Sequence, residues 1–258
     1  IPDAAAFCRQ LFQLALPALV RSHKSSENMI ASDALQAFIN MASVDTREFI
    51  SFISGVVANA QQTSTTTLSA AITSLYPLIH HHPECLVDHL VPVTGLLLKV
   101  LDPHFPMIRD VCMPASTNIL RYMVEVYPMV SFHQEKQKLA VGNIDGYVVM
   151  YDMRTASKWQ LFEAHKVPVS AVSFSPNGEY LCTYSPRDYS CKVWNTDGNS
   201  VLNLLGVGSR SIKVFEVQGN KSSMKVIDIL QHVKFEWSGP RSFTLKPGKN
   251  LNKQSFSV

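Results

Sequence analysis

The spacing of apolar residues changes near Pro128. Before this residue, apolar side chains recur every three or four positions, which places them on one face of a helix. The segment NMIASDALQAFINMA, residues 28–42, is one example. After Pro128, apolar and polar residues alternate, as they do in strands with one buried face. We therefore predict a helical region at 1–128 and a β region at 129–258.

Five helices are predicted in the first region, separated by short polar or proline-containing breaks. Asp45 or Ser43 suits the N-cap of the second helix, because Asp and Ser side chains accept hydrogen bonds from the first free N–H groups. Helices of this length in antiparallel succession predict an α-solenoid that resembles HEAT or armadillo repeats; a compact bundle is the alternative. The predicted helices are residues 28–42, 45–60, 66–81, 83–100 and 104–127.

The β region contains one pattern of strands and turns twice, with an offset of 42 residues between Leu139 and Leu181. Glycine in the turns supplies the positive φ that a tight hairpin needs. In each copy the third strand ends on an aromatic residue followed by Asp or Asn. A period of about 40–45 residues is typical of β-propellers, and the pattern resembles blades of the WD40 type. The turn and strand-end residues are Asp145, Gly146, Tyr151 and Asp152 in the first copy, and Asn177, Gly178, Trp194 and Asn195 in the second.

The predicted strands make two clear blades and part of a third. They are 129–132, 138–142, 147–151 and 159–162, then three strands within 169–195, then 201–205 as the outer strand of the second blade, 211–217 as a further outer strand, and 233–237 with 242–245 as a final, weaker blade. The link at 207–210 is short for two outer strands in succession. We therefore expect residues to be missing around 206–212 and 218–224.

The number of blades is too small for a closed ring, since a propeller typically has about four to eight. Unclosed blades leave sheet edges and faces open to water. We therefore expect further blades, from elsewhere in the same polypeptide or from a second chain, to complete the ring. The start at Ile1 instead of Met fits a part of a longer polypeptide.

The candidate functional residues are His165, Asp188, Trp194 and a hydroxyl from Thr183 or Ser185. They resemble the structural tetrad of a WD40 blade, in which the Asp accepts from the His, the hydroxyl bridges, and the indole N–H completes a buried network. A satisfied network of this kind stiffens a blade and needs no ligand. A catalytic Ser–His–Asp triad uses the same residue types, but no nucleophile elbow or oxyanion-hole glycines accompany them. We expect a structural role and no enzyme.

Composition narrows the functional classes. Of the 258 residues, 46% are hydrophobic and 17% charged, which is typical of a globular protein, and a net charge of +3 does not indicate nucleic acid as a partner. No apolar run reaches the roughly 18 residues of a membrane span. The five cysteines are scattered without a CxxC pair, which disfavours disulfide frameworks and zinc sites and fits a reducing compartment.

Three adjacent histidines, His80 to His82, invite a metal hypothesis. Successive helical residues point about 100° apart, so they cannot converge on one ion, and a helix end before Pro83 is the favoured interpretation. No cofactor or metal is expected. Near the C-terminus, Lys234, Arg241, Lys246, Lys249 and Lys253 alternate with Phe235, Trp237 and Phe243. Contact with anionic lipid or RNA is one interpretation of that segment, and a solvated rim is the favoured one.

The order of helices followed by blades is similar to the C-terminal end of the rabconnectin-3 beta subunit family. The resemblance covers nearly the whole chain and is strongest from about 127 to 195. It rests on PMVSFH at 128–133, LAVG at 139–142, YDMRT at 151–155, AHKVP at 164–168, AVSFSPNG at 171–178 and IKVF at 212–215.

This resemblance implies a large cytoplasmic scaffold, peripheral on vesicles or other acidic endomembranes. Its implied partners are the rabconnectin-3 alpha (DmX-like) subunit and the cytosolic subunits of the vacuolar proton pump, together with Rab regulators. The function implied is assembly or regulation of the pump by a rabconnectin-3/RAVE-like complex. Membrane association would be indirect, and the missing blades would come from the distant N-terminal half of the polypeptide.

A scaffold of another class remains the alternative. Vesicle coats and a regulatory subunit of a lipid kinase also combine helical solenoids with WD40 blades. In coats the propeller usually precedes the solenoid, which disfavours them here.

Overall fold

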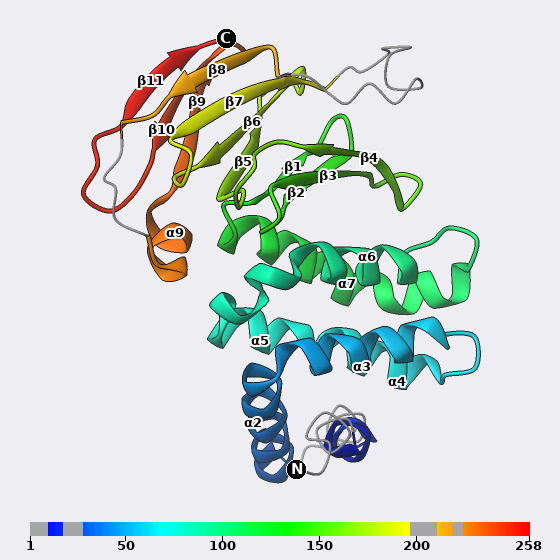
Figure 1. Cartoon of the computed structure of the whole chain (residues 1–258). Coiled ribbons are helices and arrows are strands. Elements are labelled where there is room, and N and C mark those ends of the chain that lie inside the picture. The colour runs from blue at the N-terminus through cyan, green and yellow to red at the C-terminus, as the bar shows by residue number, and fades with distance from the viewer. Residues whose placement is uncertain (1–9, 18–27, 197–210, 219–223) are drawn as a thin grey trace. The chain divides into compact units, whose positions relative to one another are not determined.

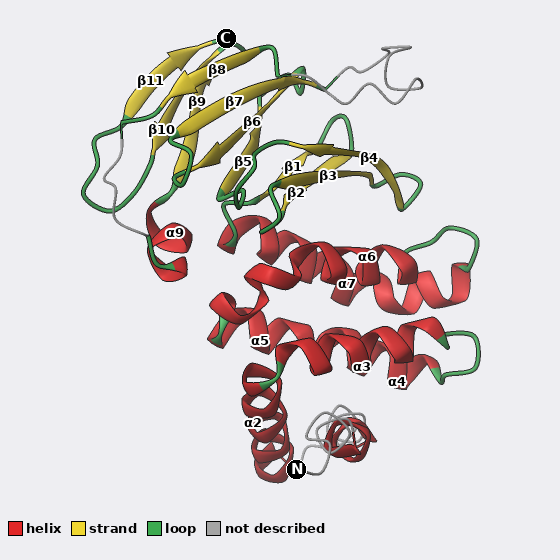
Figure 2. Ribbon diagram, viewed as in Figure 1, coloured by secondary structure: helices red, strands yellow, loops and turns green. Residues whose placement is uncertain are grey.

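The computed structural model of the protein describes residues 10–17, 28–196, 211–218 and 224–258 (Figure 1). The chain divides into two compact units, Ile1–Tyr122 and Met123–Val258. Helices form the first unit and antiparallel sheets dominate the second, as the change of period predicts (Figure 2). The two units are described separately.

The first unit is built from helices that range from 7 to 21 residues in length. Its core includes Phe12, Phe38 and Phe49, whose ring centroids lie 5.3–5.5 Å apart. The elements are residues 10–17, α2 (Asn28–Val44), α3 (Thr46–Ala58), α4 (Thr65–Thr73), α5 (Leu75–His81), the 3₁₀ helix η1 (Pro83–His89), α6 (Leu90–Val100) and α7 (Pro106–Val126), the last of which continues into the second unit.

Two of the predicted helices are each divided, and prolines explain both divisions. The predicted helix 66–81 breaks at Ser74, because Pro77 lacks the N–H that would bond to the carbonyl of Thr73. The predicted helix 83–100 begins as η1 and becomes α-helical at Leu90, which places Pro92 in the first turn of α6, where its missing N–H costs nothing.

Asp45 is the residue that caps α3. Its side chain accepts a hydrogen bond from the N–H of Glu48 at 3.1 Å. Of the two residues that the sequence offered, Asp45 therefore takes the N-cap position, and Ser43 lies inside α2.

The described residues of the second unit form three antiparallel sheets. In each sheet the strands lie in the order of the chain, as in propeller blades (Figure 1). The first sheet consists of β1 (Val130–His133), β2 (Lys138–Gly142), β3 (Tyr147–Asp152) and β4 (Ser157–Glu163); the second of β5 (Ala171–Phe174), β6 (Tyr180–Ser185), β7 (Ser190–Asn195) and β8 (Lys213–Glu216); the third of β9 (Lys234–Gly239), β10 (Ser242–Lys246) and β11 (Gln254–Ser257). A short helix, α9 (Val226–His232), precedes β9.

The outer strand of the second sheet is not the one predicted. The strand β8 pairs with β7, with Lys213 opposite Val193 and Glu216 opposite Ser190, and so occupies the position assigned to 201–205. That prediction is wrong, because β7 has only two edges and β6 takes the other. Residues 201–205 themselves, and the suspected gaps at 206–210 and 219–223, lie outside the described residues.

Two apolar cores lie between the three sheets. Alternate residues of β6 supply both: Leu181 belongs to the core between the first and second sheets, and Cys182 and Tyr184 to the core between the second and third. The second sheet is therefore buried on both faces. The third sheet alternates, with Phe243 and Leu245 buried and the residues between them more exposed.

Candidate functional site

Four of the predicted residues form one hydrogen-bonded chain in the second sheet. Trp194 Nε1 donates to Thr183 Oγ1 at 3.0 Å, and Thr183 Oγ1 lies 2.9 Å from His165 Nε2. His165 Nδ1 lies 2.8 Å from Asp188 Oδ2. Because the Asp188 carboxylate can only accept, His165 Nδ1 carries the ring proton, and Thr183, which accepts from the indole, can donate its own O–H to Nε2. Each donor in this network thus points toward Asp188.

The elements of the sheet bring these side chains together. Thr183 lies in β6 and Trp194 in β7, which are paired strands, while Asp188 lies in the hairpin between them and His165 follows β4. Thr183, His165 and Trp194 are 0%, 1% and 5% exposed. In such an environment each unsatisfied polar group would be costly, so the complete network stabilises the sheet.

Asp188 ends the network at the surface, with its side chain 28% exposed. Ser190, which the sequence analysis missed, donates to Asp188 Oδ1 from its hydroxyl at 2.9 Å and from its backbone N–H at 3.2 Å. Partial burial raises the pKa of Asp188, but the hydrogen bonds and charge of His165 and the bonds from Ser190 outweigh it, and the pKa lies below its ordinary value of 3.8. Asp188 is therefore an anion that accepts hydrogen bonds.

Gly146 fixes the segment that carries His165. The N–H groups of Ala164 and His165 both donate to the carbonyl of Gly146, at 2.9 and 3.0 Å. Gly146 has φ +88°, and a Cβ at this position would lie 2.0 Å from the carbonyl oxygen of His165. Only glycine permits this approach. The turn at Asp145 and Gly146 thus joins two strands of the first sheet and also positions His165 of the network in the second sheet.

The turn at Asn177 and Gly178 also links the first two sheets. Gly178 has φ +66°, and a Cβ there would lie 2.9 Å from His133 Nε2. His133 Nδ1 accepts the N–H of Lys136 at 3.2 Å, so Nε2 carries the proton and donates to the carbonyl of Pro176 at 3.0 Å. His133 was not singled out in the sequence.

The first sheet does not contain the network. Val141 occupies the position that Thr183 has in the second sheet, so the bridging hydroxyl is missing. Tyr151, the aromatic residue at the end of β3, is buried, and burial raises the pKa of its hydroxyl to about 12. Asp152 pairs with Lys138 at 2.7 Å. Asp145 lies in the turn, where its N–H donates to Asn143 Oδ1. The equivalent of Asp152 in the second sheet, Asn195, lies at the exposed end of β7 opposite Tyr180.

The predicted hydroxyls are poorly placed for nucleophilic catalysis. Thr183 is enclosed between His165 and Trp194 and has no exposed surface. Ser185 is also fully buried, and its Oγ accepts the N–H of Arg187 at 3.4 Å. A substrate reaches neither oxygen without opening the sheet. Ser185 is not the bridging hydroxyl of the network, and Thr183 is.

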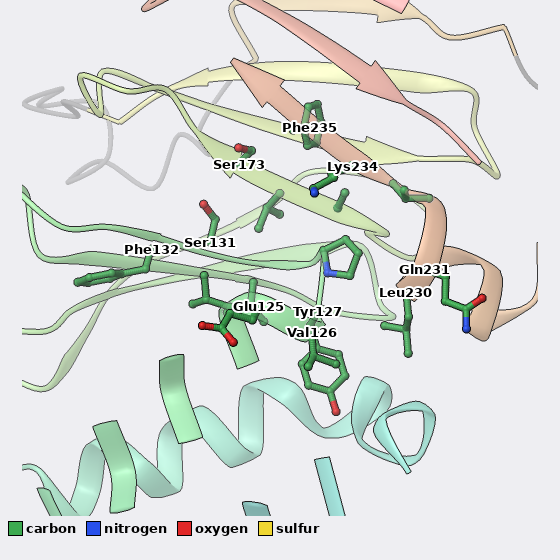
Figure 3. A pocket seen from close by; sticks show the side chains of 16 residues that line it. Glu125, Val126, Tyr127, Ser131, Phe132, Ser173, Leu230, Gln231, Lys234 and Phe235 are labelled. Carbon is green, nitrogen blue, oxygen red and sulfur yellow. The ribbon is translucent and has the colours of Figure 1, made fainter. Parts of the chain in front are cut away.

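A pocket of about 430 Å³ lies where the inner strands of the three sheets begin (Figure 3). Ser131 of β1, Ser173 of β5 and Lys234 of β9 line it, together with Gln231 of α9 and Glu125 of α7. Its volume is in the range of small-ligand sites, and its polar groups offer hydrogen bonds. It is a candidate binding site.

Two serines around this pocket hold neighbouring sheets together. Ser131 Oγ accepts the N–H of Phe174 at 3.1 Å, and Ser173 Oγ accepts Trp237 Nε1 at 2.9 Å. Ser131 and Ser173 are 42 residues apart, the same offset as the strand repeat. That offset was the signal that could have found them, because equivalent positions in successive blades make equivalent contacts.

The three adjacent histidines, His80 to His82, make different contacts in the structure. His80 Nδ1 lies 2.8 Å from the Tyr122 hydroxyl, the rings of His80 and His81 meet edge to face at 4.8 Å, and His82 Nδ1 lies 3.7 Å from Glu84 Oε1. Helix α5 ends at His81, two residues before Pro83. Among the described residues, no group of three or more His, Cys, Asp or Glu side chains is arranged to hold a metal ion. No helix in the part of the chain that the structure describes is both long enough and apolar enough to cross a bilayer.

Comparison with known proteins agrees with the blade geometry. The family "WD domain, G-beta repeat" matches residues 157–195, which run from β4 to β7 and include the whole hydrogen-bonded chain. The chain contains a WD40 repeat. The matched repeat thus begins with β4, the outer strand of the first sheet, and ends with β7, the third strand of the second sheet. The sequence repeat is therefore shifted by one strand relative to the four-stranded sheet.

Curated proteins with similar sequences include "WD repeat-containing protein 1" of Bos taurus, which is 31% identical over 83 residues, 31% of this chain and 14% of that protein. "Pre-mRNA-processing factor 19" of Oryza sativa subsp. japonica is 41% identical over 125 residues, which cover 41% of this chain and 24% of that protein. "DmX-like protein 1" of Mus musculus is 30% identical over 74 residues, 29% of this chain and 2% of that protein. The solved structure of Kluyveromyces lactis Hsv2 has a TM-score of 0.36 at 15% identity, over 46% of this chain and 37% of Hsv2. The chain therefore spans at most about a quarter of the length of these curated relatives.

Proposed function

We propose that this chain belongs to a non-catalytic scaffold subunit of a rabconnectin-3/RAVE-like complex, which promotes assembly or regulation of the vacuolar proton-pumping ATPase on endomembranes. The observation that carries the non-catalytic part is the network of the second sheet. His165, Thr183 and Asp188 bond to one another and to Trp194, and the bridging hydroxyl is inaccessible. Residues that bond to one another in this way stabilise the second sheet, and the surfaces of the blades remain for binding partners.

The order of the two units supports the same proposal. Helices precede the blades, as the resemblance to the rabconnectin-3 beta family implies, and the solenoid character of the helices is part of the proposal. The similarity to DmX-like protein 1 supports a link to that complex, in which a DmX-like subunit would be the partner and the location would be the cytoplasmic face of acidic endomembranes. Because other WD-repeat proteins are also similar, the partner is the part of the proposal that an experiment must decide.

The proposed scaffold function does not require the blades to close into a propeller ring. The face of the third sheet that points away from the second carries Lys234, Glu236, Thr244 and Lys246, and a further blade packed there would cover polar groups. Closure by blades from elsewhere therefore stays a prediction, and a blade that packed on this face would have to satisfy these polar groups.

Affinity purification of the full-length polypeptide from cells, followed by mass spectrometry, tests the function. We expect to recover a DmX-like subunit and cytosolic subunits of the proton pump. A Trp194→Ala variant should lose those partners that need the blades, whereas Trp159→Ala should keep them, because Trp159 is 40% exposed on β4. Recovery of coat or lipid-kinase subunits would overturn the proposed complex and favour the alternative scaffold.

A further inference from the structure

The third sheet has one apolar and one polar face. Phe235 and Trp237 of β9 and Phe243 of β10 pack into the core shared with the second sheet. The opposite face, named here the outward face, carries polar side chains on all three strands. They are Lys234, Glu236, Ser238, Ser242, Thr244, Lys246, Ser255 and Ser257, assigned by the alternation and the register of the strands.

Lysines form a row across this outward face. Lys234, the first residue of β9, also lines the pocket described above, and it is directly opposite Lys246 of β10. Lys253, which directly precedes β11, reaches the same face, because its Nζ contacts Glu236 Oε2 at 2.5 Å. The hydrogen bond from Lys253 and the charges of Lys253, Lys234 and Lys246 lower the pKa of Glu236, so all three ammonium groups act on this carboxylate. Three cations and one anion among these four residues leave the row positive.

This row costs stability if it has no partner. Like charges directly opposite each other in a sheet are unfavourable, and Lys234 and Lys246 form such a pair. One glutamate compensates only part of the repulsion. An anionic partner would relieve the remainder, and the hydroxyl of Ser255, two residues from Lys253, can donate to a carboxylate.

The orientation of the aromatic residues distinguishes between anionic partners. A membrane surface favours aromatic side chains that enter the lipid interface, and single-stranded RNA favours aromatic faces on which bases stack. Here Phe235, Trp237 and Phe243 are turned into the core. A flat face of lysines and hydroxyls instead fits the carboxylates of an extended polypeptide.

We propose that the outward face of the third sheet is a docking surface for an acidic polypeptide segment of a partner protein, bound by Lys234, Lys246 and Lys253. Glu236 moderates the affinity by neutralising part of the row. The proposal goes beyond the scaffold function and does not depend on which complex the protein joins.

The test uses the full chain and a short fluorescein-labelled peptide of alternating Glu and Ser, with fluorescence anisotropy as the readout. The wild-type protein should bind, and binding should weaken as salt rises, because the contacts are exposed ion pairs. Changing the three lysines together to Gln should lower the affinity about tenfold, since each exposed pair contributes a modest factor. Glu236→Gln should raise the affinity about two- to threefold, which a merely structural role of this residue would not do.

A matched control changes Lys158, Lys166 and Lys225 to Gln, since these exposed lysines lie outside the row and the net change of charge is the same. It should bind like the wild type. Thermal unfolding checks that the lysine-row variant is folded, and its midpoint should not fall. The proposal is overturned if the peptide does not bind, if the two triple variants lose affinity equally, or if phosphatidylserine vesicles or oligouridine bind through the row in preference to the peptide.

Discussion

The second and third sheets share a strand order and an antiparallel topology, yet they are stabilised differently. The second sheet is buried on both faces and contains a hydrogen-bonded chain from Trp194 to Asp188. The third buries one face through an aromatic cluster around Phe243 and exposes lysines and hydroxyls on the other. Position in the row accounts for the difference. The second sheet lies between two other sheets and has an apolar core on each side, whereas the third shares an apolar core only with the second sheet among the described residues.

The largest effect should follow from removing Trp194. Trp194→Ala deletes a side chain that is 5% exposed and leaves Thr183 without its indole donor, so the free energy of unfolding should fall by about 3–5 kcal/mol. Trp237→Ala in the third sheet should cost less, because Trp237 is only partly buried. Urea denaturation followed by circular dichroism measures both. Equal losses would contradict the distinction between the two sheets.

Gly146→Ala should be the next most damaging change. The new Cβ would meet the carbonyl oxygen of His165 at 2.0 Å, and φ +88° disfavours any side chain, so a loss of about 2–4 kcal/mol is expected. Gly239→Ala is the control in the third sheet, since nothing lies within 4 Å of its Cβ position. A thermal shift for the control as large as that for Gly146→Ala would count against this account.

Thr183→Val tests the bridge in the network itself. The change keeps the shape of the side chain and leaves His165 Nε2 and Trp194 Nε1 without their partner, at a cost of about 2–3 kcal/mol. Ser185→Ala should cost less than about 1 kcal/mol, because its hydroxyl only accepts a long bond from Arg187. The comparison decides which hydroxyl belongs to the tetrad, and the reverse order of effects would assign it to Ser185.

The pH dependence should reveal the smaller contribution of Asp188. Its pKa in the folded protein is lowered from 3.8, so its contribution to stability is present above about pH 4 and is lost as the pH falls through the folded pKa. Asp188→Asn should therefore be less stable than wild type by about 1–2 kcal/mol at neutral pH, and the two should converge in acid. Urea titrations from pH 7 to about pH 3 give this difference, and a constant gap across that range would exclude it.

The sequence predicted those features that local pattern determines. The period of apolar residues gave the helical and β regions, and turn glycines gave the hairpins at Gly146 and Gly178. The residues of the tetrad could be chosen because strands and spacing repeat. Thr183 and Ser185 could not be separated, since both are hydroxyls two positions apart on the same face of β6.

The features that sequence reasoning missed depend on contacts between distant segments. Strand β8 pairs with β7 after a long connection, so alternation near 201–205 was an unreliable guide to the outer strand. The bond from Ser190 to Asp188 and the contact of Gly146 with His165 require the folded hairpins. The breaks at Ser74 and Leu90 were readable in principle, because Pro77 and Pro92 would each remove one hydrogen bond from an uninterrupted helix.

Hydrogen–deuterium exchange of the full chain tests most directly the contrast between an internal and an end blade. Amides that exchange only on global unfolding mark the most stable part of a structure, and locally open regions exchange sooner. We predict that β6 and β7 are protected most strongly, that β10 and β11 exchange earlier, and that Thr183→Val removes the excess protection of β6 and β7. If the third sheet is protected as strongly as the second in the wild-type protein, the third sheet is not an open end of the row, and the account is contradicted.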